Sequence, residues 1–235
     1  MKILALDSAT GACSVAVWQD GAILARRFAI MDRGQSEILI PMVREVLDEA
    51  GTDFPSIDVF GVTVGPGAFT GLRIGLAAAR GMALAAGRPL VGVSTFEAVA
   101  YGVPPEELEG RQMLVAIESK REDIFVQSFD NKLIEIGEAH SVRPENLVLP
   151  NMPLLVAGDG AARLRPLFDG SAGDRTGLTG PDVRFAIGAG FPDAADVARL
   201  VASRGTGHAE AAGAVPPQPF YLRPPDVTLP AEKVR

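Results

Sequence analysis

Histidine and cysteine are both rare in this chain of 235 residues, which has two histidines and one cysteine. His140 and His208 lie far apart, and neither belongs to an HxxxH or HExxH pattern, so we expect no metal catalysis by this chain. Cys13 has no second cysteine to pair with, and its place in an apolar segment indicates a buried, inert thiol. These absences exclude an intrachain disulfide and a metal site made of several cysteines.

Positively charged residues are also fewer than negatively charged ones. Lys and Arg together number 22 against 29 Asp and Glu, which gives a formal net charge of −7. Affinity for nucleic acid comes largely from Lys and Arg that neutralise phosphates, so this chain is not expected to hold a polyanion alone. A role with RNA would require a basic partner.

Long apolar runs are missing as well. No run approaches the roughly 18 unbroken apolar residues of a membrane span. The apolar N-terminal run stops at Asp7, unlike the core of a signal peptide. We therefore expect a cytoplasmic protein that contacts no membrane. With 47% hydrophobic residues, the chain can still bury a core, and it is long enough for two small domains.

The chain does contain a glycine-rich loop between a strand and an unusually apolar helix. The β-branched run 59–64 predicts a buried strand, and residues 65–71 predict a strand-to-helix turn. Thr70 is predicted to cap the helix, whose free N–H groups could hold an anion beside Gly67. The loop matches neither a Walker A motif nor the dinucleotide-binding spacing of glycines. A tight turn that needs a positive φ is the favoured alternative.

The helix predicted over 72–86 carries only two charges, Arg73 and Arg80. Its long apolar residues point in too many directions for one buried stripe, so it must be covered nearly all round. Small residues such as Gly75 and Ala79 would let another helix approach closely. Two interpretations remain open, which are burial within this chain's own core and burial against a second protein.

Periodicity and turn residues predict two successive copies of one unit. The first copy has predicted strands at 3–7, 12–18, 23–30, 59–64 and 90–93, and helices at 36–50, 72–86 and 94–101. A polar, proline-rich stretch around 103–107 marks the boundary. The second copy has predicted strands at 113–118, 124–129, 133–138 and 154–160, a short helix to 168, and a helix at 194–203. The second copy differs from the first in three places. The stretch 143–150 is too short for a full helix, residues 169–182 are expected to form an exposed loop, and residues 215–226 are expected to form an extended tail.

This pattern predicts a duplicated α/β fold of the actin and Hsp70 type (ASKHA, ribonuclease H-like), with subdomains at 1–102 and 103–235 and a ligand cleft between them. In such a fold, the acid-ended first strands and the loops after them face the cleft. Nucleotide or anion contacts are therefore predicted at Asp7, Ser8, Thr10, Gly67 and Thr70, with Glu118 as the acid of the second copy. The alternative for both acids is a strand-end side chain that caps a turn.

Four stretches resemble one known family. They are Gly65-Pro-Gly-Ala-Phe-Thr-Gly-Leu-Arg-Ile-Gly75, the opening Leu4-Ala-Leu-Asp7-Ser-Ala-Thr10, the segment Val93-Ser-Thr-Phe-Glu97-Ala and the tail Phe220-Tyr-Leu-Arg223. In this order they resemble the TsaB family, also called YeaZ, over most of the chain. The resemblance implies a subunit that helps to install the threonylcarbamoyl group on the adenosine beside the anticodon of tRNAs that read codons beginning with adenine.

The resemblance also implies that this chain is not the catalyst. TsaB is the non-catalytic paralogue of the transferase TsaD, in which two histidines four residues apart bind the catalytic metal. The corresponding positions here are Thr95 and Val99, on either side of Glu97, and neither carries an imidazole. No cofactor is thus expected on this chain alone, and ATP and a metal are implied only for the assembled complex, through its partners.

Partner contacts are implied by the same resemblance. It implies direct pairing with TsaD through the two N-terminal helices, addition of the ATPase TsaE, and contact with tRNA only within the complex. The predicted partner-binding residues are Ile38, Leu39, Met42, Val46, Leu72, Arg73, Gly75, Leu76, Ala79 and Arg80. A homodimer of the isolated chain is an open alternative. The competing function is an independent actin-fold ATPase or phosphotransferase that uses Asp7 and Glu118.

Overall fold

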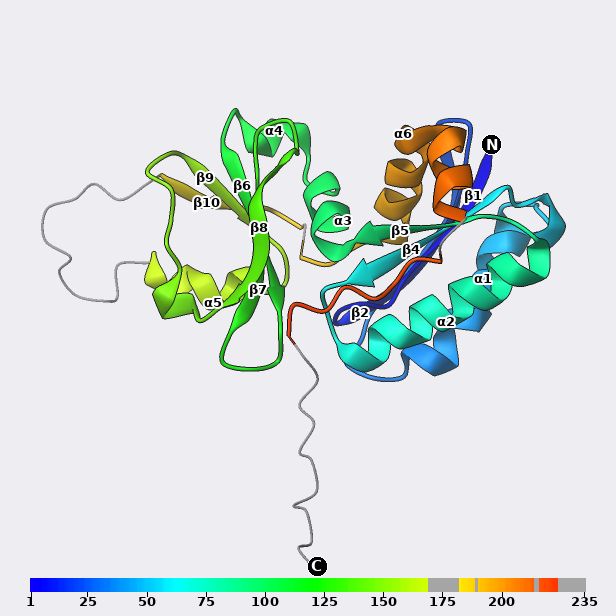
Figure 1. The fold of residues 1–235 in the computed structure, drawn as a ribbon, viewed down its shortest axis with the longest axis horizontal. Helices are drawn as coiled ribbons and strands as arrows, with labels where there is room; N and C mark the ends of the chain where they lie inside the picture. The colour runs from blue at the N-terminus through cyan, green and yellow to red at the C-terminus, as the bar shows by residue number, and fades with distance from the viewer. Residues whose placement is uncertain (169–181, 189, 214–215, 224–235) are drawn as a thin grey trace, which may run out of the picture.

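The computed structural model describes residues 1–168, 182–188, 190–213 and 216–223. Most of the loop predicted over 169–182, and the end of the tail predicted over 215–226, lie outside the described residues. The described part forms two β-sheets with helices between and around them (Figure 1). No helix within it is both long and apolar enough to cross a bilayer.

The first sheet contains β1 (Lys2–Asp7), β2 (Ala12–Gln19), β3 (Ala22–Ile30), β4 (Val59–Gly65) and β5 (Leu90–Ser94). These strands lie in the order β3-β2-β1-β4-β5. The first three form an antiparallel meander, whereas β4 runs parallel to β1 and β5 parallel to β4. Parallel neighbours require crossover connections. Helix α1 (Gln35–Glu49), followed by the 3-10 turn η1 (Phe54–Ser56), leads into β4, and α2 (Phe69–Ala86) connects β4 to β5.

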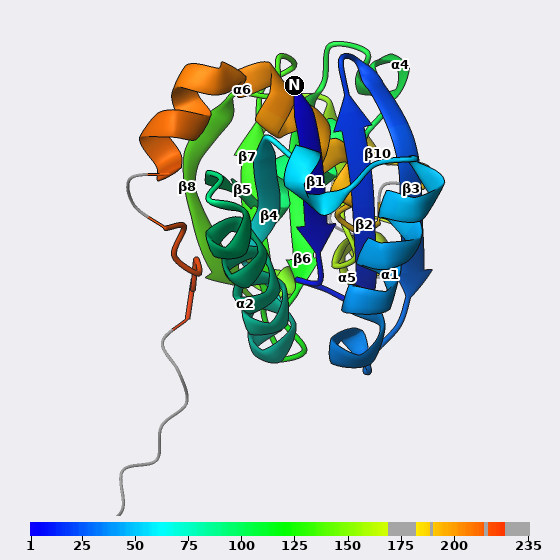
Figure 2. The same ribbon diagram turned by 90° about the vertical axis from the view of Figure 1, so that its right-hand side faces the viewer.

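Apolar side chains of β1 point alternately to the two faces of this sheet, and each face is covered by different helices. Leu4 and Leu6 belong to a core with α1 and α2, whereas Ile3 and Ala5 belong to a core with α6 (Ala194–Gly213). Successive side chains of a strand point to opposite faces, so both faces of this sheet are apolar and both need a helical cover. Figure 2 shows α1 and α2 together on one side of the sheet and α6 beyond the other.

The second sheet repeats the arrangement of the first. It contains β6 (Gln112–Glu118), β7 (Ile124–Phe129), β8 (Glu135–Val142), β9 (Leu154–Ala157) and β10 (Val183–Phe185). The order is β10-β9-β6-β7-β8, so β6 takes the central place of β1, antiparallel to β7 and parallel to β9. This repeated order confirms the duplicated actin and Hsp70 type fold (ASKHA, ribonuclease H-like) predicted from the sequence.

Two helices cross between the halves. Helix α3 (Thr95–Tyr101) follows β5 but packs its Phe96 and Val99 against the second sheet, and α6 packs against the first. A capping box fixes the start of α3, since the Glu97 N–H donates to Ser94 Oγ at 3.0 Å and the Ser94 N–H donates to Glu97 Oε2 at 2.9 Å. The short α4 (Pro105–Leu108) leads into β6. The subdomain division at residue 102 stays a prediction.

The second half has no counterpart of α1 within the described residues. The stretch 143–150 holds the 3-10 turn η2 (Pro144–Asn146), and β9 is followed by α5 (Ala161–Leu164) and the turn η3 (Arg165–Leu167). Strand β8 begins at Glu135 instead of the predicted residue 133, because the Asp130 carboxylate accepts the backbone N–H groups of Lys132 and Ile134, both at 2.8 Å. Leu133 is held in this turn with φ 61°, which is incompatible with a strand.

Candidate functional site

A cavity of about 1120 Å³ lies where the two halves meet, beside the carboxyl ends of β1, β4 and β6. Its walls are Thr10, residues 32–36 at the start of α1, residues 66–71 with Arg73 and Ile74 at the start of α2, residues 119–121 with Phe125 at the β6–β7 turn, and residues 220–223. Ligands of open α/β sheets bind outside the carboxyl ends of the strands, so this is the place where the fold favours a ligand.

The structure separates the predicted nucleotide or anion contacts into two groups. Thr10, Gly67 and Thr70 line the cavity. Asp7 and Ser8 do not line it, and their exposed fractions are 0% and 1%. The contacts proposed for these five positions therefore stay predictions. Only Thr10, Gly67 and Thr70 have access to a ligand in the cavity.

Asp7 supports the turn after β1. Its Oδ1 accepts from the Thr63 hydroxyl at 2.6 Å and from the Ala9 N–H at 3.1 Å, while Oδ2 has no hydrogen-bond partner among the described residues. Burial raises the pKa of this carboxyl to about 7, although the two hydrogen bonds act in the opposite direction. The bond from Ala9 is the contact expected of the turn-capping alternative.

The glycines after β4 are required by contacts inside the chain. Gly65 has φ 115°, a conformation that strains any side chain, so the predicted tight turn with a positive φ is confirmed here. A Cβ at Gly67 would lie 2.1 Å from the carbonyl oxygen of Ala9, and a Cβ at Gly71 would lie 2.1 Å from that of Ser8. The loop therefore rests directly on the turn between β1 and β2.

Helix α2 begins at Phe69, earlier than the predicted residue 72. Its N-cap is Ala68, which offers no side-chain cap and donates its N–H to Ala9 O at 2.7 Å. Thr70 lies inside the first turn and is exposed. The prediction that Thr70 caps this helix is wrong, because the contact of the loop with the β1–β2 turn sets where the helix starts.

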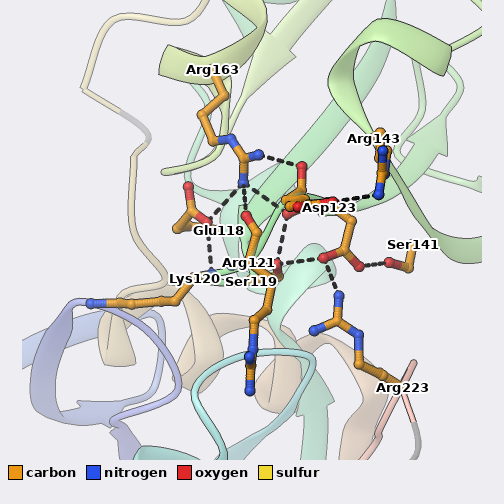
Figure 3. A network of polar contacts seen from close by, with 10 residues as sticks. Glu118, Ser119, Lys120, Arg121, Asp123, Ser141, Arg143, Arg163 and Arg223 are labelled. Carbon is orange, nitrogen blue, oxygen red and sulfur yellow. Dashed lines mark hydrogen bonds and ion pairs between the residues drawn. The ribbon is translucent and has the colours of Figure 1, made fainter.

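Glu118, the acid at the end of β6, is engaged within the second half. Its Oε1 accepts from the Arg163 guanidinium at 3.1 Å and from the Lys120 N–H at 2.7 Å, while the Glu118 N–H donates to Asp159 Oδ1 at 2.8 Å. Burial raises the pKa of Asp159 to about 6. Figure 3 shows Arg163 reaching both Glu118 and carbonyl groups of the β6–β7 turn. This acid therefore orders a turn, as Asp7 does in the first half.

The positions that correspond to metal-binding histidines hold core residues. Thr95, the first residue of α3, is 0% exposed, and its hydroxyl has no partner among the described residues. Val99 is 1% exposed and packs in the core between α3 and the second sheet. His140 lies on the exposed strand β8 with Nδ1 3.0 Å from the carbonyl of Glu138. In the part of the chain that is described, no three His, Cys, Asp or Glu side chains are grouped so that they could hold a metal ion.

The predicted partner-binding residues fall on two sides of the α1 and α2 pair. The inner side contains Leu39, Val46, Leu72, Leu76 and Ala79, each at most 3% exposed. Gly75 also faces inward, since a Cβ there would lie 2.7 Å from Ser8 Oγ. Ile38, Met42 and Arg80 are half-buried, and Arg73 is exposed. The inner residues hold the helices on the sheet, and only the remaining four are accessible to a second protein.

Sequence reasoning missed most of the outer side of these helices. Its exposed residues include Ile40 on α1 and Leu84 on α2, with exposed fractions of 41% and 84%. Ala77 and Gly81 are exposed as well, and a Cβ at Gly81 would meet nothing within 4 Å. Figures 1 and 2 show that α1 and α2 lie side by side at the outside of the molecule. The sequence does contain a pattern that separates the two sides of α2, because the buried residues 72, 76, 79 and 83 recur at the spacing of one helix face.

Comparison with known proteins agrees with this architecture. A family model described as TsaD, tRNA N6-adenosine threonylcarbamoyltransferase, matches residues 29–158. An Escherichia coli protein named tRNA threonylcarbamoyladenosine biosynthesis protein TsaB is 36% identical over 152 residues, which are 65% of this chain and 64% of that protein. The Haemophilus influenzae protein of the same name is 30% identical over 125 residues, 53% of this chain and 52% of that protein. The chain thus matches less than two thirds of the length of each relative.

Solved structures match over a longer range. YeaZ from Pseudomonas aeruginosa superposes with a TM-score of 0.73 at 27% identity, and the match covers 94% of this chain and 99% of that chain. A second structure, described as an uncharacterized protein with similarity to peptidase YEAZ from the same organism, gives a TM-score of 0.74 at 27% identity with the same coverage.

Two sheets with one strand order, a helix from each half on the sheet of the other, and a cavity between them define a protein of the duplicated actin and Hsp70 class. The match to the TsaD family model spans more than half of the chain, and the relatives and the solved structure reported above carry the names TsaB and YeaZ. Within this class, the chain belongs to the TsaB (YeaZ) family.

Proposed function

We propose that this chain is a non-catalytic scaffold and activating subunit of the complex that transfers a threonylcarbamoyl group to the adenosine adjacent to the anticodon of tRNAs reading codons that begin with adenine. Its relatives in E. coli and H. influenzae are named for the biosynthesis of this nucleoside. The observation that carries the proposal is an apolar strip on the outer side of α2, which contains Ala77, Gly81 and Leu84 and stays exposed in the described part of the chain. TsaD is the proposed direct partner, and TsaE joins them.

The outer side of α1 and α2 suits a contact between helices. Ala77 and Gly81 keep one strip of α2 free of bulk, so a partner helix can approach to about 8–10 Å between axes. Leu84, which is 84% exposed, supplies apolar area beside this strip, as the centre of a stable interface requires. A homodimer of the isolated chain would use the same surface, so the two assemblies exclude each other.

The acids and the former metal positions support a role without catalysis by this chain. Asp7 is buried behind the loop, Glu118 is paired with Arg163, and Thr95 and Val99 lie in the core. ATP and a metal are therefore proposed to be held by the partners, and tRNA to be reached only through the complex. Repeated ATP hydrolysis by the isolated chain in the presence of Mg²⁺ would instead support the alternative of an ATPase or phosphotransferase.

Reconstitution of the modification reaction tests the proposal. We expect TsaD from the same organism to co-purify with this chain. When supplied with threonylcarbamoyl-adenylate as the donor, TsaD should form threonylcarbamoyladenosine in tRNA, with release of AMP, only when this chain and TsaE are present. Full modification by TsaD and TsaE in its absence would contradict the activating role. Lack of co-purification would contradict the pairing.

Two alanines of α2 provide a matched test of the surface. Ala77→Leu adds bulk to the exposed side and should weaken TsaD binding by about tenfold, on the order of 1 kcal/mol, with an unchanged melting temperature. Ala79→Leu adds the same bulk to a residue that is 0% exposed and should lower the free energy of unfolding by about 1–3 kcal/mol. Titration calorimetry and thermal melts measure both effects. Wild-type affinity in Ala77→Leu would remove this strip from the proposed interface.

A further inference from the structure

Residues 216–223 follow the last described helix and run from the first half of the molecule to the second. Figure 1 shows this segment in red, passing β4 and the start of α2 on its way towards the second sheet. Its last four residues, 220–223, form one wall of the cavity between the halves. A change in the opening of the cleft would therefore change the position of this segment relative to one of the two halves.

Several contacts hold this segment to the first half. The Phe220 N–H donates to the carbonyl of Val64 at 2.7 Å, directly at the end of β4. Pro217 lies on β5 so closely that a Cβ at Gly92 would come within 2.8 Å of its ring. The guanidinium of Arg80 donates to the Pro217 carbonyl. Three elements, β4, β5 and α2, thus contact the segment.

Tyr221 adds a contact with the first turn of α2. Its ring stacks on Phe69 with 5.6 Å between centroids, and its hydroxyl accepts from Arg73 Nε at 3.2 Å. The Arg73 guanidinium in turn lies 3.6 Å from the centroid of the Phe69 ring. The stacked rings and the cation contact order the segment against the helix.

The next two residues are held by the second half. Leu222 packs against the core formed by α3 and the second sheet. Arg223 forms an ion pair with Asp123, whose side chain is 13% exposed and which also accepts from the hydroxyls of Ser119, at 3.0 Å, and Ser141. Figure 3 shows Arg223 pointing at Asp123 from outside the turn. Burial favours a higher pKa for Asp123, but the hydrogen bonds from Ser141, Arg223 and Ser119 lower it to about 2, so its charge persists at neutral pH.

The two sets of contacts are immediate neighbours in the sequence. Phe220 is bonded to the first half and Arg223 to the second, only three residues further along. An extended chain spans at most about 3.5 Å per residue, so the backbones of Phe220 and Arg223 lie within roughly 10 Å of each other, and only the Arg223 side chain adds to the reach between the halves. We propose that residues 216–223 form a strap that ties the two halves together and limits how far the cleft can open. The strap shares Arg73 and Arg80 with the predicted partner-binding residues, but it can be tested on the isolated chain, without TsaD or tRNA and so independently of the proposed function.

A distance measurement between the halves tests the strap. Spin labels on Arg44→Cys in α1 and Lys132→Cys in the β7–β8 turn place one probe on each half, at exposed positions. Cys13 is 0% exposed and does not compete for the label. Arg223→Ala removes the attachment to the second half, and Arg80→Ala removes one attachment to the first. We expect both substitutions to shift the distance distribution of the full-length labelled protein to longer values and to broaden it.

Arg143→Ala is the matched control, because Arg143 pairs with Glu122 inside the second half. It should leave the distribution unchanged, and Arg223→Lys, which keeps the positive charge, should restore most of the parent distribution. Circular dichroism identifies variants that fail to fold, in which case Tyr221→Ala replaces the lost variant. Unchanged distances in the folded variants, or an equal shift in Arg143→Ala, would overturn the proposal.

Discussion

The two halves share one strand order but differ in what covers their sheets. The first sheet has α1 and α2 on one face and α6 on the other. Among the described residues, the second sheet has α3 on one face and only the short α5 with loop residues on the other. Polar contacts around Glu118 and Arg163 order the loops of the second half instead (Figure 3). One copy of a duplicated fold can therefore lose its helices while the other keeps a helix pair whose outer side is available to a partner.

The largest effect is expected where helix packing in the first half is broken at Gly71. In Gly71→Ala the new Cβ would lie 2.1 Å from the carbonyl oxygen of Ser8, so α2 must move away from the β1–β2 turn. We expect the free energy of unfolding to fall by about 3 kcal/mol or more. Gly81→Ala, on the outer side of the same helix, should raise it by about 0.5–1 kcal/mol. Urea denaturation of both variants checks this difference, which equal effects would contradict.

The buried acid of the first half has an effect that is smaller for each single pH unit. The pKa of Asp7 is raised from 3.8 to about 7, so between these values the folded protein holds a proton that the unfolded chain has lost. The free energy of unfolding should therefore fall as the pH rises from about 4 to 7, by at most ~1.4 kcal/mol per pH unit. Asp7→Asn should flatten this slope and leave the part that Asp159 contributes. Denaturation curves across this range measure the slope, and an identical slope in the variant would disprove the assignment.

The smallest effect is expected in the second half. Arg163→Met keeps an unbranched stem but removes the donors to Glu118 and to the carbonyl groups of the β6–β7 turn. With side chains 29% and 25% exposed, the pair should contribute about 1–2 kcal/mol to the free energy of unfolding. Arg184→Met is the control, because its pair with Glu109 is more than half exposed and should contribute little. Thermal melts compare the two, and equal losses would argue against a special role for this turn.

Much of the fold could be predicted because its signals are local. Alternating residues such as Ile3 and Leu4 mark both faces of a strand, and the repeated acid-ended strand marks the duplication. The start of α2 could not be predicted, since it depends on Gly67 and Ala68 meeting Ala9 from a distant part of the chain. The inner side of α2 was hard to recognise, because small and apolar residues such as Ala77 and Leu84 also occupy its exposed side.

The candidate site shows the same limit. The positions of Thr10, Gly67 and Thr70 at the cavity follow from the strand order, which the sequence pattern indicates. The burial of Asp7 and the pair between Arg223 and Asp123 bring together residues from separate elements, and no periodic pattern records such contacts. Polar pairs between residues far apart in the sequence are therefore visible only in the structure.

Helix α6 completes the first half although it is the last helix of the described chain. Val197 and Val201 fill the core beside Ile3, and Arg204 pairs with Glu97 at the start of α3. On the ribosome, the first sheet emerges with this face bare, and the cover arrives only after about 200 residues have been synthesised. The nascent chain thus carries one open apolar face of the first sheet through most of its translation, until α6 has been made.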